Sequence, residues 1–134
     1  LVSAFPGTGK SYYFKKSNKE VLDSDSSTFD KSKFPENYIE HIKKNMGIVD
    51  VILISSHEEV RDALVSAKLD FTLIYPDKSL KKEYIQRYKD RGNEEGFIKL
   101  LDTNWDSWLG DVLNQKNAKH IVLNSGEYLT DVIK

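Results

Sequence analysis

The sequence predicts one α/β domain over residues 1–134, built on a mostly parallel β-sheet. Short runs of β-branched and aliphatic residues recur along the chain and have the length of buried strands. Longer segments with apolar residues at helical spacing separate the later runs, and this alternation is typical of βαβ units. With 39% hydrophobic residues, a chain of 134 residues can also bury a core without disulfides or metals.

The apolar runs are the expected strands. The first run is shorter than a usual strand of about 5–6 residues, and the chain starts with Leu1 rather than methionine. We therefore expect the first strand to begin upstream of Leu1. The runs are Leu1–Val2, Val21–Leu22, Val49–Ile54, Phe71–Tyr75 and Lys119–Leu123.

Helices are expected where apolar spacing is bounded by capping signals. Pro35 and Gly47 bound a pattern that runs from Tyr38 to Met46. Ser56–Glu59 has the form of a capping box and precedes a pattern that continues to Ala67. The polar segment Ser24–Lys33 is a loop or a short helix. Further helices are expected at Tyr12–Phe14, Ser79–Arg91, Trp105–Leu113 and Glu127–Ile133.

The composition excludes several classes of protein. The chain has 20 basic and 21 acidic residues, and the resulting net charge of -1 gives no strong nucleic-acid signal. Without cysteine there are no disulfides or thiolate metal sites, and three scattered histidines make zinc binding unexpected. No apolar run approaches the about 20 residues that span a bilayer, and no signal peptide is visible. We expect a cytoplasmic protein with no membrane segment.

The segment Ala4-Phe5-Pro6-Gly7-Thr8-Gly9-Lys10-Ser11, called the glycine loop below, follows the Walker A pattern with alanine in the first glycine position. Gly7 and Gly9 let the backbone wrap around an anion and point N–H groups inward. Lys10 would reach the β- and γ-phosphates of ATP, and the Ser11 hydroxyl would coordinate Mg²⁺. Pro6–Ser11 are therefore the expected nucleotide-binding residues. The alternative is a glycine-rich surface turn, which has no need of the lysine–serine pair.

Two carboxylates follow the second expected strand. Asp23 and Asp25 are two residues apart, so their side chains would project in the same general direction. They would lie at the carboxyl edge of the sheet, where open α/β sheets bind ligands. Asp25 suits the base that receives the proton of an acceptor hydroxyl, and Asp23 suits support of Mg²⁺. The alternative is a solvated, serine-rich turn.

The third expected strand ends in serine, whereas a Walker B strand usually ends in aspartate. The second carboxylate expected near Mg²⁺ is therefore absent, which increases the importance of Asp23. His57 is either a first-turn helix residue or a catalytic one. Arg61 lies one helical turn further on and would meet either a substrate anion or a surface ion pair.

The helix expected over Ser79–Arg91 carries arginines on its apolar stripe. On a wheel of about 100° per residue, Arg87 and Arg91 share a face with the tyrosines of this helix. Buried arginines need anionic partners, and the phosphates being transferred are such partners. We therefore expect both to be catalytic residues in a lid whose flexible end is Gly92–Gly96. The alternative is an internal salt bridge to a local carboxylate.

Asn124, at the end of the last expected strand, is a candidate contact for the nucleotide base. A helix cap by Asn124 or Ser125 is the alternative. Trp105 and Trp108 are interpreted as core residues or as the lining of a groove.

These motifs resemble those of the P-loop kinases of small molecules and nucleotides. Residues 5–11 look like their phosphate loop, that of polynucleotide kinases included, and Leu22–Asp25 resembles the aspartate-x-aspartate motif of shikimate kinase. Tyr84–Gly92 looks like the arginine-bearing lid of nucleotide kinases, and the whole chain is similar to nucleotide-kinase-like proteins of phages and prophages. The resemblance implies a three-layer P-loop NTPase fold, a five-stranded parallel sheet of order 2-3-1-4-5 with helices on both faces, and ATP with Mg²⁺ as cofactors.

The expected function is transfer of the ATP γ-phosphate to a nucleoside, nucleotide or other small hydroxyl compound. The first alternative is a 5′-hydroxyl polynucleotide kinase, which would need a continuous basic groove. The second is a nucleotide-binding regulatory protein without transferase activity, which the missing strand-end carboxylate favours. A GTPase is not expected, because the guanine-specific asparagine-lysine-x-aspartate motif is absent. The sequence does not predict the oligomeric state.

Overall fold

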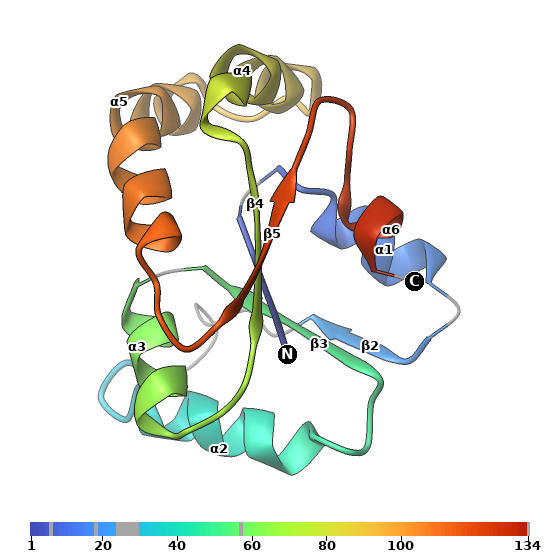
Figure 1. Ribbon diagram of the computed structural model, residues 1–134, viewed down its shortest axis with the longest axis vertical. Helices are drawn as coiled ribbons and strands as arrows, with labels where there is room; N and C mark the ends of the chain where they lie inside the picture. The colour runs from blue at the N-terminus through green and yellow to red at the C-terminus, as the bar shows by residue number, and fades with distance from the viewer. Residues whose placement is uncertain (6, 18, 24–29, 57, 134) are drawn as a thin grey trace.

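Five parallel strands form one sheet in the expected order, β2-β3-β1-β4-β5 (Figure 1). The computed structural model describes residues 1–5, 7–17, 19–23, 30–56 and 58–133, and for residues 11, 23 and 55 it describes the backbone alone. Each strand lies within two residues of its predicted range. The strands are β1 (Val2–Ala4), β2 (Val21–Asp23), β3 (Val51–Ser55), β4 (Thr72–Pro76) and β5 (Lys119–Leu123).

Helices cover both faces of this sheet. In Figure 1, α1 and α6 lie on one side of the strands, whereas α2, α3 and α5 lie on the other. No helix in the described part of the chain is long and apolar enough to cross a membrane. The helices are α1 (Lys10–Lys16), α2 (Glu36–Asn45), α3 (Glu58–Ser66), α4 (Lys81–Asp90), α5 (Glu95–Leu113) and α6 (Leu129–Val132), with a 3₁₀ turn, η2 (Lys78–Leu80), before α4.

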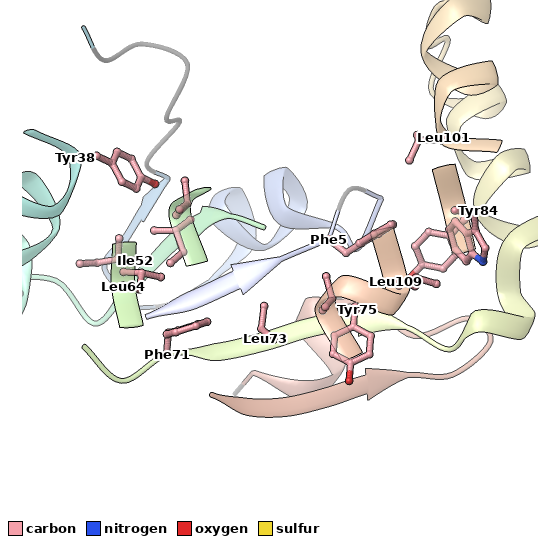
Figure 2. Packing of buried hydrophobic residues seen from close by; sticks show 14 of the residues in the cluster. Phe5, Tyr38, Ile52, Leu64, Phe71, Leu73, Tyr75, Tyr84, Leu101 and Leu109 are labelled. Carbon is pink, nitrogen blue, oxygen red and sulfur yellow. The ribbon is translucent and has the colours of Figure 1, made fainter. Parts of the chain in front are cut away.

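Alternating side chains of the strands supply the two cores that hold the layers together. In β3, Ile52 and Ile54 belong to the larger cluster, whereas Leu53 belongs to the cluster on the opposite face. The larger cluster joins the sheet to α2, α3, α4 and α5 (Figure 2). The smaller one includes Tyr13 of α1 and Leu129 of α6. The fold is therefore a three-layer α/β/α arrangement, as expected.

The middle strand, β1, lies where the chain changes sides of the sheet. Its last residue, Ala4, pairs with Ser55 of β3 and with Ile74 of β4. From β1 the chain passes to β2 and β3 on one side, and then crosses to β4 and β5 on the other. Open parallel sheets bind ligands at the carboxyl edge beside such a switch point. The glycine loop begins at this place.

Several helix boundaries differ from those predicted. Helix α5 begins at Glu95, ten residues before the predicted start, because Ile98 and Leu101 extend the apolar spacing of Trp105 backward over a polar stretch. Helix α4 is shorter than predicted, since its first turn is the 3₁₀ turn η2. Helix α6 has only four residues. Part of the polar segment predicted as a loop or short helix, residues 24–29, lies outside the described residues.

Candidate functional site

Two glycines give the glycine loop its shape. Gly7 has φ 85° and Gly9 has φ 88°, a left-handed conformation that other residues rarely adopt. Between them, Thr8 is fully buried, and its hydroxyl donates to the carbonyl of Phe5 at 2.8 Å. The space around both glycines is also limited, because a Cβ on Gly7 would lie 2.9 Å from the ring of Tyr88. Both glycines are thus required by backbone conformation and by close packing.

The loop carbonyls are held outward by donors from other elements. Arg87 Nη1 donates to the oxygen of Gly7 at 2.9 Å, and the Leu129 N–H donates to that of Thr8 at 2.9 Å. In a planar trans peptide, the N–H of the next residue points away from the carbonyl oxygen. The N–H groups of Thr8 and Gly9 are therefore directed away from Arg87 and Leu129, toward the inside of the loop.

The N–H groups of the glycine loop lack acceptors among the described residues. Within the described part of the chain, the N–H groups of Gly7, Thr8 and Gly9 donate to no protein atom. Thr8 is 0% exposed, so its N–H also lacks contact with solvent. A buried N–H without an acceptor is unfavourable and rare. An anion bound in the loop would satisfy the N–H groups of the partly exposed Gly7 and Gly9, and would reach that of Thr8 only after a shift of the loop. Successive N–H groups in such turns are known to form anion-binding concavities.

Lys10 and Ser11 open α1, directly after the loop. Lys10 is half-buried. The helix has only seven residues, so its dipole would contribute less to the binding of an anion than the N–H groups of the loop. The side chain of Ser11 and the whole of Pro6 lie outside the described residues.

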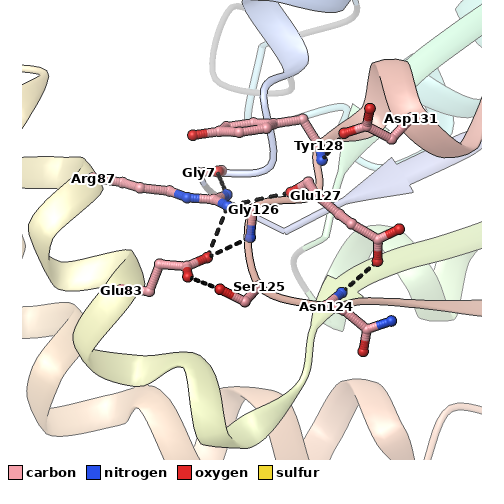
Figure 3. A network of polar contacts seen from close by, with 9 residues as sticks. All are labelled: Gly7, Glu83, Arg87, Asn124, Ser125, Gly126, Glu127, Tyr128 and Asp131. Atoms are coloured by element: carbon pink, nitrogen blue, oxygen red, sulfur yellow. Dashed lines mark hydrogen bonds and ion pairs between the residues drawn. The ribbon is translucent and has the colours of Figure 1, made fainter.

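Arg87 fastens α4 to the glycine loop (Figure 3). Its guanidinium carbon lies 4.2 Å from the ring centre of Tyr84 and 4.0 Å from that of Tyr128. Whereas Nη1 donates to Gly7, Nη2 pairs with Glu83 at 3.1 Å and donates to the carbonyl of Glu127 at 3.2 Å. The side chain is 10% exposed. The predicted inward position is therefore confirmed, but the contacts are structural: they connect α4 to the glycine loop and to the segment before α6.

Glu83 connects Arg87 to the turn after β5. Its carboxylate accepts from the Ser125 hydroxyl, from the Gly126 N–H at 3.1 Å and from Arg87. The hydrogen bonds from Ser125 and Gly126, followed by Arg87, lower the pKa of Glu83 below its ordinary value. Burial raises the pKa of Tyr84 to about 12, so this phenol stays protonated and cannot act as a base near neutral pH.

The prediction that Arg91 shares the buried face was wrong. Arg91 is exposed; it is the C-cap residue of α4, which ends at Asp90. The predicted flexible segment Gly92–Gly96 is also shorter than expected, since Glu95 and Gly96 belong to α5. Only residues 91–94 connect the two helices.

The acidic residues are placed only in part. Asp23 is the last residue of β2 and pairs with Leu53, which also pairs with Val2, so the backbone of Asp23 is level with the start of β1, two residues before Ala4. The side chain of Asp23 and the whole of Asp25 lie outside the described residues. Among the described residues, no group of three histidines, aspartates or glutamates could hold a metal ion. Magnesium held together with a triphosphate needs only one or two protein oxygens.

Asn124 lies one residue after β5 and is exposed. Its N–H donates to the Glu127 carboxylate at 2.7 Å. The helix-cap alternative was wrong for both Asn124 and Ser125, because α6 begins after Tyr128, whose N–H donates to Asp131 at 2.8 Å. The side chain of Asn124 is therefore not occupied in capping, and its contact with a nucleotide base stays a prediction.

The environment of Arg61 also differs from the predictions. Its side chain is almost fully buried rather than at the surface, and it donates from Nε to the carbonyl of Ser56 at 2.9 Å. Helix α3 is described from Glu58, so whether Ser56 is its N-cap stays a prediction. The residue between them, His57, lies outside the described residues. Trp105 is a core residue, as predicted, whereas Trp108 is partly exposed.

Three contributors to this region were not found from the sequence: Glu83, Tyr88 and Tyr128. The spacing of Glu83 and Arg87, four residues apart, is a recognised signal for a helical ion pair and could have identified Glu83. The tyrosines carry no such signal, because their contacts with the loop depend on how distant elements pack.

No protein-family model matches this chain. Comparison with curated proteins also finds no match.

Proposed function

We propose that the protein binds ATP with Mg²⁺ in the glycine loop and transfers its γ-phosphate to a hydroxyl of a small acceptor, a nucleoside or a nucleotide. The main support is the loop itself. Its carbonyls are held outward by Arg87 and Leu129, and its N–H groups have no acceptor among the residues that the structure describes. Phosphate oxygens are suitable acceptors for such a group of donors.

The sequence supplies the remaining roles. Lys10 would contact the β- and γ-phosphates, where its charge stabilises the transition state. Mg²⁺, when bound, would neutralise phosphate charge, and Ser11 and Asp23 are the residues that would hold it or its water ligands. Asp25 would receive the proton of the acceptor hydroxyl while that oxygen bonds to the γ-phosphorus. The bond from the γ-phosphorus to the β–γ bridging oxygen then breaks, and ADP leaves.

The charge of one large groove, away from the glycine loop, does not suit a polynucleotide. This groove lies between α2 and α3 and has a volume of about 790 Å³. Glu36, Glu40, Glu59 and Asp62 line it with a single basic residue, Lys43. A phosphate backbone would be repelled there, since nucleic-acid affinity depends on neutralising cations.

The test combines nucleotide binding with phosphoryl transfer. Lys10→Ala should abolish measurable ATP affinity by calorimetry in Mg²⁺, whereas Lys16→Ala, an exposed lysine at the other end of α1, should bind ATP normally. Asp25→Asn should bind ATP but lower kcat about 10²–10⁴-fold. Transfer from γ-labelled ATP is assayed with nucleosides, nucleotides and a 5′-hydroxyl oligonucleotide. Equal ATP binding by Lys10→Ala and wild type would refute the proposal.

A further inference from the structure

We infer that the small cavity beside the glycine loop binds the ring of the acceptor, and that this ring is a pyrimidine base. The inference rests on the proposed function and narrows its acceptor. The cavity has a volume of about 160 Å³ and lies between α3 and α5, at the carboxyl ends of β1 and β3. Phe5 and Ser56 line it, and they directly follow Ala4 and Ser55, which pair in the sheet. A ring bound here would therefore be next to the start of the glycine loop.

A buried cation with an unused donor borders this cavity. The Arg61 side chain, in a residue that is 4% exposed, donates to the carbonyls of Ser56 and Asp111 and to Gln115 Oε1. These bonds use Nε and Nη1, whereas Nη2 makes no hydrogen bond to any residue that the structure describes. A guanidinium carries five N–H donors. A ligand carbonyl in the cavity would accept from Nη2.

The charges around Arg61 disfavour an anionic ring. The carboxylates of Glu58 and Asp111 also line the cavity, and both act electrostatically on the guanidinium. Two carboxylates beside one guanidinium leave the cavity with a net negative charge. The ligand expected here is therefore neutral, with a carbonyl for Arg61 and an N–H for a carboxylate, and not the substrate anion that the sequence suggested for Arg61.

The volume and the walls of the cavity select the kind of ring. Phe5, Trp108 and Val112 supply apolar surface, which suits the faces of a planar ring. A cavity of roughly 150 Å³ accommodates benzene, so about 160 Å³ holds a single six-membered ring and not a fused purine. Pyrimidine bases combine this size with a ring carbonyl and with an N–H, the amino group of cytosine or the ring N–H of uracil. A sugar ring has neither the flat faces nor the carbonyl.

Titration calorimetry of the full chain with nucleosides tests this inference. Cytidine and uridine should bind at least about tenfold more tightly than adenosine and guanosine. Orotidine, which adds a carboxylate to the uridine ring, should also bind about tenfold more weakly than uridine because of the acidic lining. Equal affinity for purine and pyrimidine nucleosides, or tighter binding of orotidine, would overturn the assignment.

Two matched variants locate the binding site. Asp111→Ala removes a carboxylate of the cavity but keeps the backbone carbonyl that Arg61 contacts, and should weaken cytidine binding by about five- to tenfold. Asp106→Ala removes an exposed carboxylate of the same helix, outside the cavity, and should not change the affinity for cytidine. An equal loss in both variants, or in neither, refutes the cavity as the site. Trp108→Ala provides a second variant with the same expected loss.

Parallel titration with ATP separates the two proposals. ATP binding without pyrimidine binding refutes the cavity assignment and leaves the proposed function intact. Pyrimidine binding without ATP binding supports the cavity and refutes the phosphotransferase.

Discussion

Replacing Arg87 with methionine tests whether this residue positions the glycine loop. Methionine keeps part of the side-chain length, but it lacks the charge that faces the rings of Tyr84 and Tyr128 and cannot donate hydrogen bonds. The carbonyls of Gly7 and Glu127 each lose a charged donor. Hydrogen bonds to charged groups contribute about 1.5–3 kcal/mol each. Using the lower value for each bond, since both carbonyls are partly exposed, the loss is about 3 kcal/mol.

The remaining contributions are small. The ion pair with Glu83 is partly exposed, so its loss adds at most about 1 kcal/mol, and contacts of the methionine sulfur with the rings offset part of it. A domain with a stability of about 5–15 kcal/mol stays folded after such a loss. Urea denaturation should therefore show a folded variant with an unfolding free energy lowered by about 3 kcal/mol.

The effect on ATP distinguishes positioning from simple stabilisation. Without its donor, the Gly7–Thr8 peptide must be ordered when the nucleotide binds, and ordering one residue costs about 1–2 kcal/mol. Calorimetry should then show ATP binding weakened by about 5–30-fold, with partial recovery in Arg87→Lys. A destabilised Arg87→Met protein with unchanged ATP affinity would show that Arg87 is structural only. An unchanged free energy of unfolding would refute the whole account.

Three further substitutions test separate features. In urea denaturation, Gly7→Ala should lower the free energy of unfolding by about 1–3 kcal/mol more than Gly92→Ala does. Both glycines have positive φ, but only a Cβ on Gly7 meets a neighbouring ring, that of Tyr88. Equal losses in the two variants would show that the Tyr88 ring moves aside to accommodate the methyl group. Arg91→Ala should change stability by less than about 0.5 kcal/mol and lower kcat about a hundredfold if this exposed arginine closes on the phosphates; an unchanged kcat removes it from the site. The pKa of Glu83 is lowered in the folded state, so its contribution to stability is present above its unfolded pKa and is lost as pH falls through the folded pKa. Denaturation midpoints from about pH 3 to about pH 7 should therefore converge at the acid end for wild type and Glu83→Gln, and a constant difference would contradict the pKa shift.

Local patterns in the sequence were sufficient for the sheet but not for the contacts between distant elements. The strands were predictable because each is a compact apolar run, and the strand order followed from the resemblance of the motifs. The positive φ angles of Gly7 and Gly9 could likewise be expected, because their role depends on the backbone of the loop alone.

The arginines show where local reasoning fails. A helical wheel places Arg87 and Arg91 on the same face, but it does not show that α4 ends between them. Arg61 has no local signal for burial, because its partners Asp111 and Gln115 belong to the end of α5 and the residues after it, about fifty residues along the chain. Tertiary packing decided the environment of all three side chains.

The hydrogen bond from the Leu129 N–H to the Thr8 carbonyl joins segments near the two ends of the sequence. During synthesis Thr8 emerges from the ribosome well before its partner Leu129. The β1–β3 pairing can form earlier, because β3 lies in the first half of the chain. A nascent chain with β5 and α6 still inside the ribosome would therefore have the glycine loop without this restraint on its carbonyl. This restraint on the glycine loop would therefore form only after Leu129 has emerged, when β1 and β3 have had time to pair.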